Sequence, residues 1–229
     1  MLSRLLACVV LVGATLLAGC ATPTRMAYGD DAQRTDAPAN PVMLMTANFK
    51  NKYRPDYQPK LLVVHVERPG AADAKDRINF TMDDKARMET GNADVGNTYL
   101  LRMELPPGKY QIVGMTSRSG IFPVTGAFFA PLHIPLEVTD NGVFYLGHVN
   151  AVVRERQGNE FRAGPPIPLI DQAVIGASGG TFDIEIVDAQ ARDEALFRER
   201  FPALKDATIR KAMLPGFDRA RAQKWWEEH

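Results

Sequence analysis

Residues 99–116, YLLRMELPPGKYQIVGMT, decide the fold class of this chain. The first part of this stretch alternates, because Tyr99, Leu101, Met103 and Leu105 are separated by residues such as Arg102 and Glu104. A period of two is typical of a strand with one buried face. Pro106-Pro107-Gly108 follows, and Pro and Gly suit the two central positions of a type II turn. The sequence therefore predicts an antiparallel hairpin of residues 99–105 with residues 109–116.

Similar short segments continue on both sides of this stretch. Alternating or β-branched segments occupy residues 60–67, 77–82, 134–138, 143–156 and 181–187. Asp140-Asn141-Gly142 predicts a further hairpin turn, because Asn and Gly tolerate positive φ. In the strand that follows, Tyr145, Val149 and Val153 are expected on one face. Strands at this spacing, with no helix between them, indicate a mainly β fold, an antiparallel sandwich or open barrel over residues 42–188.

The last forty residues change to a helical pattern. Residues 189–201 are rich in Ala, Glu and Arg, and Pro202 ends this predicted helix. Asp206 is a candidate N-cap for a second helix that contains Ile209, and Asp218 for a third that contains Trp225 and Trp226. We expect these helices, within residues 189–229, to pack on the sandwich.

The N-terminus has the features of an export signal. Arg4 precedes an uncharged, mostly apolar run of 14 residues, 5–18, which is followed by Gly19 and Cys20. Such a run is typical of a signal peptide and short for a membrane span. Residues 1–19 are therefore predicted to be a cleaved signal peptide. Residues 20–41, with three prolines and few large apolar residues, are predicted to be a flexible tether.

Charge and cysteine content narrow the function classes. The chain has 27 basic and 27 acidic residues, and this balance gives no reason to expect nucleic acid as a partner. Its two cysteines are Cys8 and Cys20. Cys8 leaves with the signal peptide, so the exported domain is expected to be held without disulfides. If the signal were an ordinary secretory one, Cys20 would be a single free thiol.

No motif points firmly to catalysis. Residues 176–180, GASGG, match the G-x-S-x-G nucleophile elbow in letters, but Ser178 precedes a predicted strand where the elbow needs a helix. His65, His133, His148 and His229 form no metal-binding pair on one element. We therefore expect no enzyme activity, no cofactor and no metal. A hydrolase that uses Ser178 or a histidine-centred site is kept as an alternative.

Aromatic residues supply the candidate binding site. Residues 117–132, SRSGIFPVTGAFFAPL, combine Phe122, Phe128 and Phe129 with glycines and prolines, and Trp226 lies near the C-terminus. Core packing is the simpler interpretation of these rings. The functional interpretation is a partly exposed aromatic loop that binds a glycan or a protein partner.

Two motifs carry resemblances to known families. Leu17-Ala18-Gly19-Cys20 resembles the lipobox of bacterial lipoproteins, which implies cleavage before Cys20 and lipidation of its sulfur, with palmitate among the acyl chains. Residues 105–110, LPPGKY, resemble a turn of bacterial transthyretin-like and carboxypeptidase-regulatory-like modules. Together with Tyr145-Leu146-Gly147 they also resemble a family of uncharacterised envelope lipoproteins. These resemblances cover about residues 61–187 and imply an Ig-like or prealbumin-like sandwich with no catalytic residues.

These observations combine into one expectation. The chain is predicted to be a lipid-anchored, non-enzymatic module of the cell envelope that binds an envelope protein or a glycan, or assists envelope assembly. Ala21 follows the cysteine, and in the lipoproteins that the chain resembles the lack of an acidic residue there favours the outer membrane, facing the periplasm. The alternatives are a carbohydrate or cell-wall binder that uses the aromatic loop, and a hydrolase.

Overall fold

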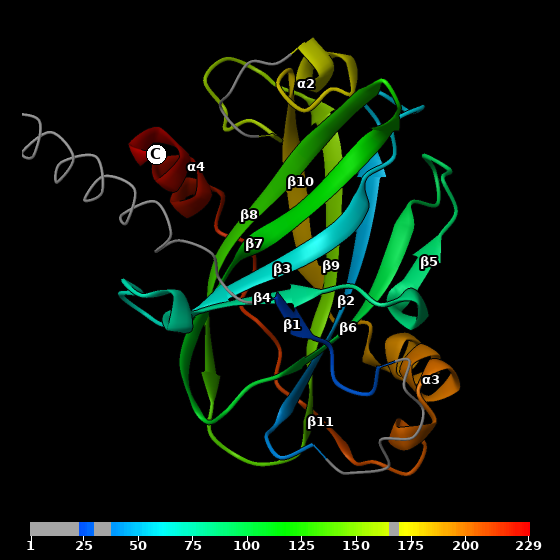
Figure 1. Ribbon diagram of the computed structural model, residues 1–229, viewed down its shortest axis with the longest axis vertical. Coiled ribbons are helices and arrows are strands. Elements are labelled where there is room, and N and C mark those ends of the chain that lie inside the picture. The colour runs from blue at the N-terminus through cyan, green and yellow to red at the C-terminus, as the bar shows by residue number, and fades with distance from the viewer. Residues whose placement is uncertain (1–22, 30–37, 165–169) are drawn as a thin grey trace, which may run out of the picture.

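The computed structural model describes residues 23–29, 38–164 and 170–229 and shows two β-sheets packed face to face (Figure 1). The first sheet has the strand order β1-β4-β3-β7-β8. Its strands are β1 (Pro23–Arg25), β3 (Lys60–Glu67), β4 (Arg77–Thr81), β7 (Gly108–Ile121) and β8 (Val124–Val138). The predicted signal peptide, residues 1–19, and Cys20 lie outside the described residues.

The second sheet has the strand order β10-β9-β2-β6-β5, and β11 also pairs with β9. Its strands are β2 (Val42–Asn51), β5 (Arg87–Glu89), β6 (Asn97–Glu104), β9 (Val143–Glu155), β10 (Gly180–Val187) and β11 (Ile209–Lys211). Three pairs are parallel, namely β1 with β4, β2 with β9, and β11 with β9. The two sheets are therefore mixed rather than purely antiparallel.

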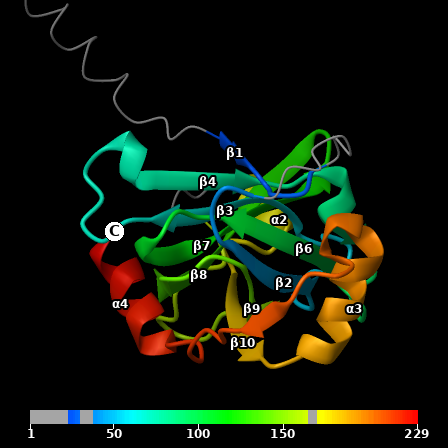
Figure 2. The same ribbon diagram turned by 90° about the horizontal axis from the view of Figure 1, so that it is seen from below.

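Helices lie at the borders of the sandwich. They are α2 (Ile170–Val174), α3 (Gln190–Arg200) and α4 (Arg219–Glu228), with short 3-10 turns η1 (Ala74–Asp76), η2 (Asp84–Ala86) and η3 (Pro202–Leu204). Figure 2 shows α3 and α4 on opposite sides of the two sheets. In the part of the chain that is described, no helix is both long and apolar enough to cross a membrane. The predicted mainly β sandwich with a C-terminal helical appendage is confirmed.

The core lies between the two sheets. Alternate side chains of a strand point to opposite faces, so β2 sends Met43, Met45, Ala47 and Phe49 inward. From β6, Tyr99 and the apolar residues that alternate with it are fully buried, as the sequence predicts. Phe49 meets both Tyr99 and Phe182 of β10 edge to face, with ring centroids 6.3 and 6.1 Å apart. Such aromatic contacts add to the hydrophobic gain from burial.

Both predicted hairpins are wrong. β6 pairs with β2 and β5, whereas β7 pairs with β3 and β8 in the other sheet. Pro and Gly suit a crossover between sheets as well as a tight turn, and here the chain crosses from one sheet to the other. The Tyr110 hydroxyl donates to the Pro106 carbonyl at 2.9 Å and fixes this corner. The segment with Asn141-Gly142 crosses in the same way, from β8 to β9.

The long hairpin of the molecule is β7–β8. It is paired from Gly108 opposite Val138 to Ile121 opposite Val124 and turns at Phe122-Pro123. The segment 117–132 is therefore largely paired strand rather than an aromatic loop.

Residues 23–29, which were predicted to be part of the flexible tether, pack on the sandwich. β1 pairs with β4, from Pro23 opposite Asn79 to Arg25 opposite Thr81. The chain then crosses to the second sheet, where the Ala27 N–H donates to the Arg102 carbonyl at 2.8 Å. Met26 is 4% exposed and lies in the core between the sheets. Its burial explains why this short segment folds with the domain.

The C-terminal region contains two of the three predicted helices. α3 lies within residues 189–201, and α4 begins at Asp218, whose Oδ1 accepts the Arg221 N–H at 3.0 Å. The second predicted helix is wrong, because Ile209–Lys211 forms β11. β10 pairs with β9 only from His148 onward, and β11 pairs with the remaining part, Val143–Tyr145. The backbone groups of Val143–Tyr145 that β10 does not reach are thus hydrogen-bonded by β11.

Candidate functional site

The outer face of β2 changes from apolar to polar along the strand. Val42 and Leu44 lie under Phe197 of α3 and the residues that follow this helix. Thr46, Asn48 and Lys50 continue the same face beyond the start of α3. They line a pocket of about 290 Å³, which we call the outer-face pocket. The helix thus covers the apolar half of this sheet face, and along the polar half Thr46 and Asn48 are still buried while Lys50 is half-buried.

A β-bulge brings His148 to this face. In the β2–β9 pairing, Tyr145 lies opposite Leu44 and His148 lies opposite Thr46, with a register shift between them. Gly147 lies inside this bulge with φ +123°, a conformation that suits glycine. The predicted shared face of Tyr145 with Val149 and Val153 is therefore wrong, since the two valines point into the core and Tyr145 points outward.

Four strands, one helix and the loop before β6 supply the lining of the outer-face pocket. The residues are Thr46, Asn48 and Lys50 of β2, Thr98 of β6, His148 and Asn150 of β9, Arg192, Asp193 and Leu196 of α3, and Met88 and Val95 beside them. Most of these side chains are polar, and three are apolar. Small-molecule sites are usually concave and mostly apolar with a few convergent polar groups, so this more polar lining favours a polar ligand.

Asp193 anchors α3 to the sheet at this pocket. Its carboxylate is fully buried, accepts from the Tyr145 hydroxyl at 2.8 Å, and pairs with Arg192 at 2.7 Å. Burial alone would raise the pKa of Asp193, but hydrogen bonds from His148, Tyr145 and Arg192 outweigh it, and the pKa lies below its ordinary value. Burial and the bond to Asp193 raise the pKa of Tyr145. Asp193 is therefore an ionised carboxylate whose hydrogen-bonding capacity is already used.

His148 links this cluster to the pocket. Its Nε2 lies 3.0 Å from Asn150 Oδ1, and its Nδ1 lies 2.7 Å from Arg192 Nη2 and 3.3 Å from Asp193 Oδ2. A neutral ring accepts from Arg192 through Nδ1 and donates from Nε2 to Asn150, whereas a protonated ring donates from Nδ1 to Asp193. Both ring nitrogens therefore have partners in either state.

Two buried polar atoms of the pocket have no partner. Thr46 is 0% exposed and Asn48 is 5% exposed, yet Thr46 Oγ1 and Asn48 Oδ1 make no hydrogen bond within the part of the chain that is described. The amide nitrogen of Asn48 donates to Thr98 Oγ1 at 2.8 Å and to the Val95 carbonyl, which fixes the side chain. Buried polar atoms are nearly always hydrogen-bonded, and leaving one unpaired costs about 1–3 kcal/mol. The wall of the pocket therefore contains two unsatisfied hydrogen-bonding positions.

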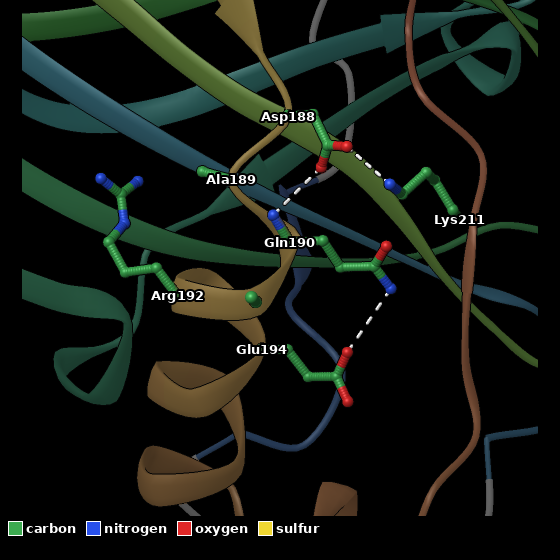
Figure 3. A pocket seen from close by; sticks show the side chains of 7 residues that line it. Asp188, Ala189, Gln190, Arg192, Glu194 and Lys211 are labelled. Atoms are coloured by element: carbon green, nitrogen blue, oxygen red, sulfur yellow. Dashed lines mark hydrogen bonds and ion pairs between the residues drawn. The ribbon is translucent and has the colours of Figure 1, made fainter.

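A second, shallow hollow lies at the start of α3 (Figure 3). Asp188 accepts from the Gln190 N–H at 3.1 Å and from Lys211 at 2.5 Å, and Gln190 donates to Glu194 at 3.4 Å. In Figure 3, Arg192 extends away from this group to the other side of the helix. These polar groups satisfy one another, so the hollow has less to offer a ligand than the outer-face pocket.

The structure does not bring the predicted aromatic residues together. Phe122 is 90% exposed at the tip of the β7–β8 hairpin, whereas Phe128 is 0% exposed in the core. Phe129 is half-buried and packs on Trp225, with ring centroids 5.5 Å apart. Trp226 is half-buried against the core, with Arg156 over its ring. These four residues do not form one binding surface, and the predicted site Cys20 lies outside the described residues.

The residues considered for catalysis lie on different elements, although His133 and His229 both stack on Trp225. Ser178 follows α2 and precedes β10, the reverse of the strand and helix that flank a nucleophile elbow. His65 bonds Asn79 at 2.8 Å and Thr116 at 2.7 Å within the first sheet, and His133 stacks on Trp225. Among the described residues, no group of three or more His, Cys, Asp or Glu is placed to hold a metal ion.

The outer-face pocket was not predicted from the sequence, although β2 carries a signal for it. Along VMLMTANFKN, the outward positions change from Val and Leu to Thr, Asn and Lys, while the inward positions stay mostly apolar. When one face of a strand is apolar throughout and the other is apolar over only half its length, we expect another element to pack on only the apolar half of the second face. The contributions of His148 and Asp193 depend on a bulge and on helix docking, which this pattern does not contain.

Comparison with known proteins gives no relative, since no family model, no curated protein and no solved structure matches the chain.

Proposed function

We propose that this chain is a lipid-anchored protein of the cell envelope whose β-sandwich is a non-enzymatic binding module. The observation that carries the binding role is the outer-face pocket, where Thr46 and Asn48 hold unpaired polar atoms in a buried setting. A group buried without a partner is costly to keep, and a ligand that bonds it removes this cost.

The proposed anchor is Cys20, in the lipobox-like sequence Leu17-Ala18-Gly19-Cys20. β1 begins at Pro23, only three residues after Cys20. Three extended residues reach about 10 Å. Because residues 23–29 pack on the sandwich, an anchor at Cys20 would hold the domain close to the membrane surface rather than on a long tether. The periplasmic face of the outer membrane is the proposed location.

Membrane fractionation tests the anchor. We expect the wild-type protein to incorporate labelled palmitate and to sediment with membranes, and Cys20→Ala to lose both properties. Cys8→Ala is the matched control, because this cysteine lies within the predicted signal peptide, and it should behave as wild type. A Cys20→Ala protein that remains palmitate-labelled and membrane-bound would overturn the anchor.

Side-chain NMR tests the binding role. The amide signals of Asn48 and Asn150, which line the outer-face pocket, should shift when envelope saccharides and small organic acids are added. Asn159 is exposed and lies outside the pocket lining, so its signal serves as a control. If neither pocket amide shifts, or if the three amides shift alike, the binding role at this pocket is wrong.

A further inference from the structure

We infer that the ligand of the outer-face pocket is a small carboxylate that also carries hydroxyl groups, as in a sugar acid. This inference rests on the proposed binding role of the same pocket and adds the chemical class of the ligand.

The charges that line the pocket favour an anion. Lys50 makes no ion pair with any of the described residues. Arg192 directs its Nε and Nη2 at Asp193, which leaves Nη1 without a carboxylate partner among the described residues. Asp193 is the single carboxylate of the described lining, and Tyr145 and Arg192 occupy its oxygens. A ligand carboxylate beside Lys50 would therefore meet positive charge and no competing open carboxylate.

The unpaired atoms require a hydrogen-bond donor as well. Asn48 Oδ1 is an acceptor, and its own amide nitrogen is already used by Thr98 and Val95. A carboxylate or a fully ionised phosphate oxygen cannot donate to it, whereas a hydroxyl group can. The Thr46 hydroxyl can both donate and accept, so it fits a neighbouring ligand hydroxyl. A simple anion would leave Asn48 Oδ1 unpaired, and a neutral sugar would leave Lys50 unpaired.

The size and walls of the pocket agree with a single small molecule. Its volume of about 290 Å³ lies at the lower end of the range for small-molecule sites. Met88, Val95 and Leu196 provide apolar wall on one part of the lining. A sugar ring presents C–H groups to such a wall while its hydroxyls reach polar partners.

Calorimetric titration of the full lipidated protein, in a detergent without a sugar headgroup, tests the ligand class. The probes are D-glucuronate, which carries both a carboxylate and hydroxyl groups, D-glucose, which carries hydroxyl groups alone, and acetate, which carries a carboxylate alone. We expect D-glucuronate to bind at least about tenfold more tightly than either of the others, the typical effect of one charge-assisted hydrogen bond.

Two variants assign the contacts. Lys50→Met should remove the preference for glucuronate over glucose, while Lys52→Met, an exposed lysine outside the lining, should keep it. Thr46→Val should weaken glucuronate binding by about tenfold while leaving thermal stability equal or higher, because it replaces an unpaired buried hydroxyl by a methyl group. A loss of binding in Thr46→Val is therefore distinct from unfolding.

The outcomes separate this inference from the proposed function. Glucose binding as tightly as glucuronate, or acetate binding as tightly with no effect of Thr46→Val, would overturn the ligand class and leave a binding module. No binding by any probe, combined with unshifted Asn48 and Asn150 amides in the broader NMR screen, would overturn the binding role itself. The Cys20→Ala fractionation reports on the anchor independently of both.

Discussion

His133 is a buried histidine whose titration couples stability to pH. It is 5% exposed, stacks on Trp225 at a centroid distance of 4.7 Å, and accepts at Nδ1 from the Gln111 amide at 3.3 Å. Burial, reinforced by the charges of His229 and Arg221, lowers the pKa of His133 to about 4. Its Nε2 has no partner among the described residues. The folded protein therefore keeps this ring neutral where the unfolded chain already binds a proton.

The sign of the pH effect follows from this difference. The unfolded histidine titrates near 6.5, so the contribution of His133 is complete above about pH 6.5. It falls as the pH drops towards about 4 and is constant below that. We expect the free energy of unfolding to lose on the order of 1–3 kcal/mol over this range because of His133. Urea unfolding at pH 7 and pH 4.5 measures the loss.

His133→Asn is the matched variant, because Asn tolerates the positive φ of 49° at this position. The variant should lose less stability than wild type on acidification, although it is less stable at pH 7. Equal losses in the two proteins would show that His133 does not contribute.

Truncation of two phenylalanines in the same segment, Phe128 and Phe122, should have very different effects on the free energy of unfolding. Phe128 is fully buried and meets Phe182 at a centroid distance of 6.2 Å, so Phe128→Ala should cost about 3–5 kcal/mol of unfolding free energy. Phe122 is 90% exposed, so Phe122→Ala should change stability by less than about 0.5 kcal/mol. Thermal or urea unfolding compares them, and equal effects would contradict the placement of both rings.

At the scale of elements, sequence patterns predicted where strands and two helices occur but not how strands pair. Alternation identified residues 99–105 as a strand with a buried face because burial depends on local period. The predicted hairpin partner was wrong because a Pro-Gly turn and a crossover between sheets share the same turn residues. Ile209–Lys211 was expected in a helix, and its strand conformation is imposed by the open edge of β9, which local sequence does not encode.

The bulge at Gly147 is the element-scale feature on which the outer-face pocket depends. A Cβ on Gly147 would approach the Met213 methyl to 2.9 Å, and φ is +123°. We expect Gly147→Ala to lower the unfolding free energy by about 1–3 kcal/mol and to move His148 relative to Thr46. Gly216→Ala is the control, since nothing lies within 4 Å of its added Cβ and its φ is ordinary. Equal stability of the two variants would show that the bulge is not strained by a side chain.

At the scale of the whole molecule, residues 23–29 and α4 lie across opposite open sides of the sandwich. α4 spans the edges formed by β8 and β10, because Arg221 donates to the His133 carbonyl at 3.0 Å and Arg219 donates to the Phe182 carbonyl at 2.8 Å. Residues 23–29 span the opposite side, from β4 to β6. Uncovered strand edges invite pairing with other chains. Residues 23–29 and α4 therefore protect the sheets, and the segment next to the proposed anchor is part of the fold.

Arg102 connects the N-terminal segment, residues 23–29, to the rest of the molecule. It is fully buried, pairs with Asp83, donates to the Ala27 carbonyl at 2.7 Å and to the Leu100 carbonyl at 2.8 Å, and lies over the Phe201 ring at 3.9 Å. Removing one member of a buried ion pair typically costs about 3–5 kcal/mol, because the other loses its partner. We expect Arg102→Leu to show a loss of this size, with faster hydrogen exchange at the Ala27 amide. Arg118→Leu, on an exposed position of β7, should change neither property. If the Ala27 amide stayed as protected in Arg102→Leu as in wild type, the N-terminal segment would be held by β4 alone, and the connection through Arg102 would be wrong.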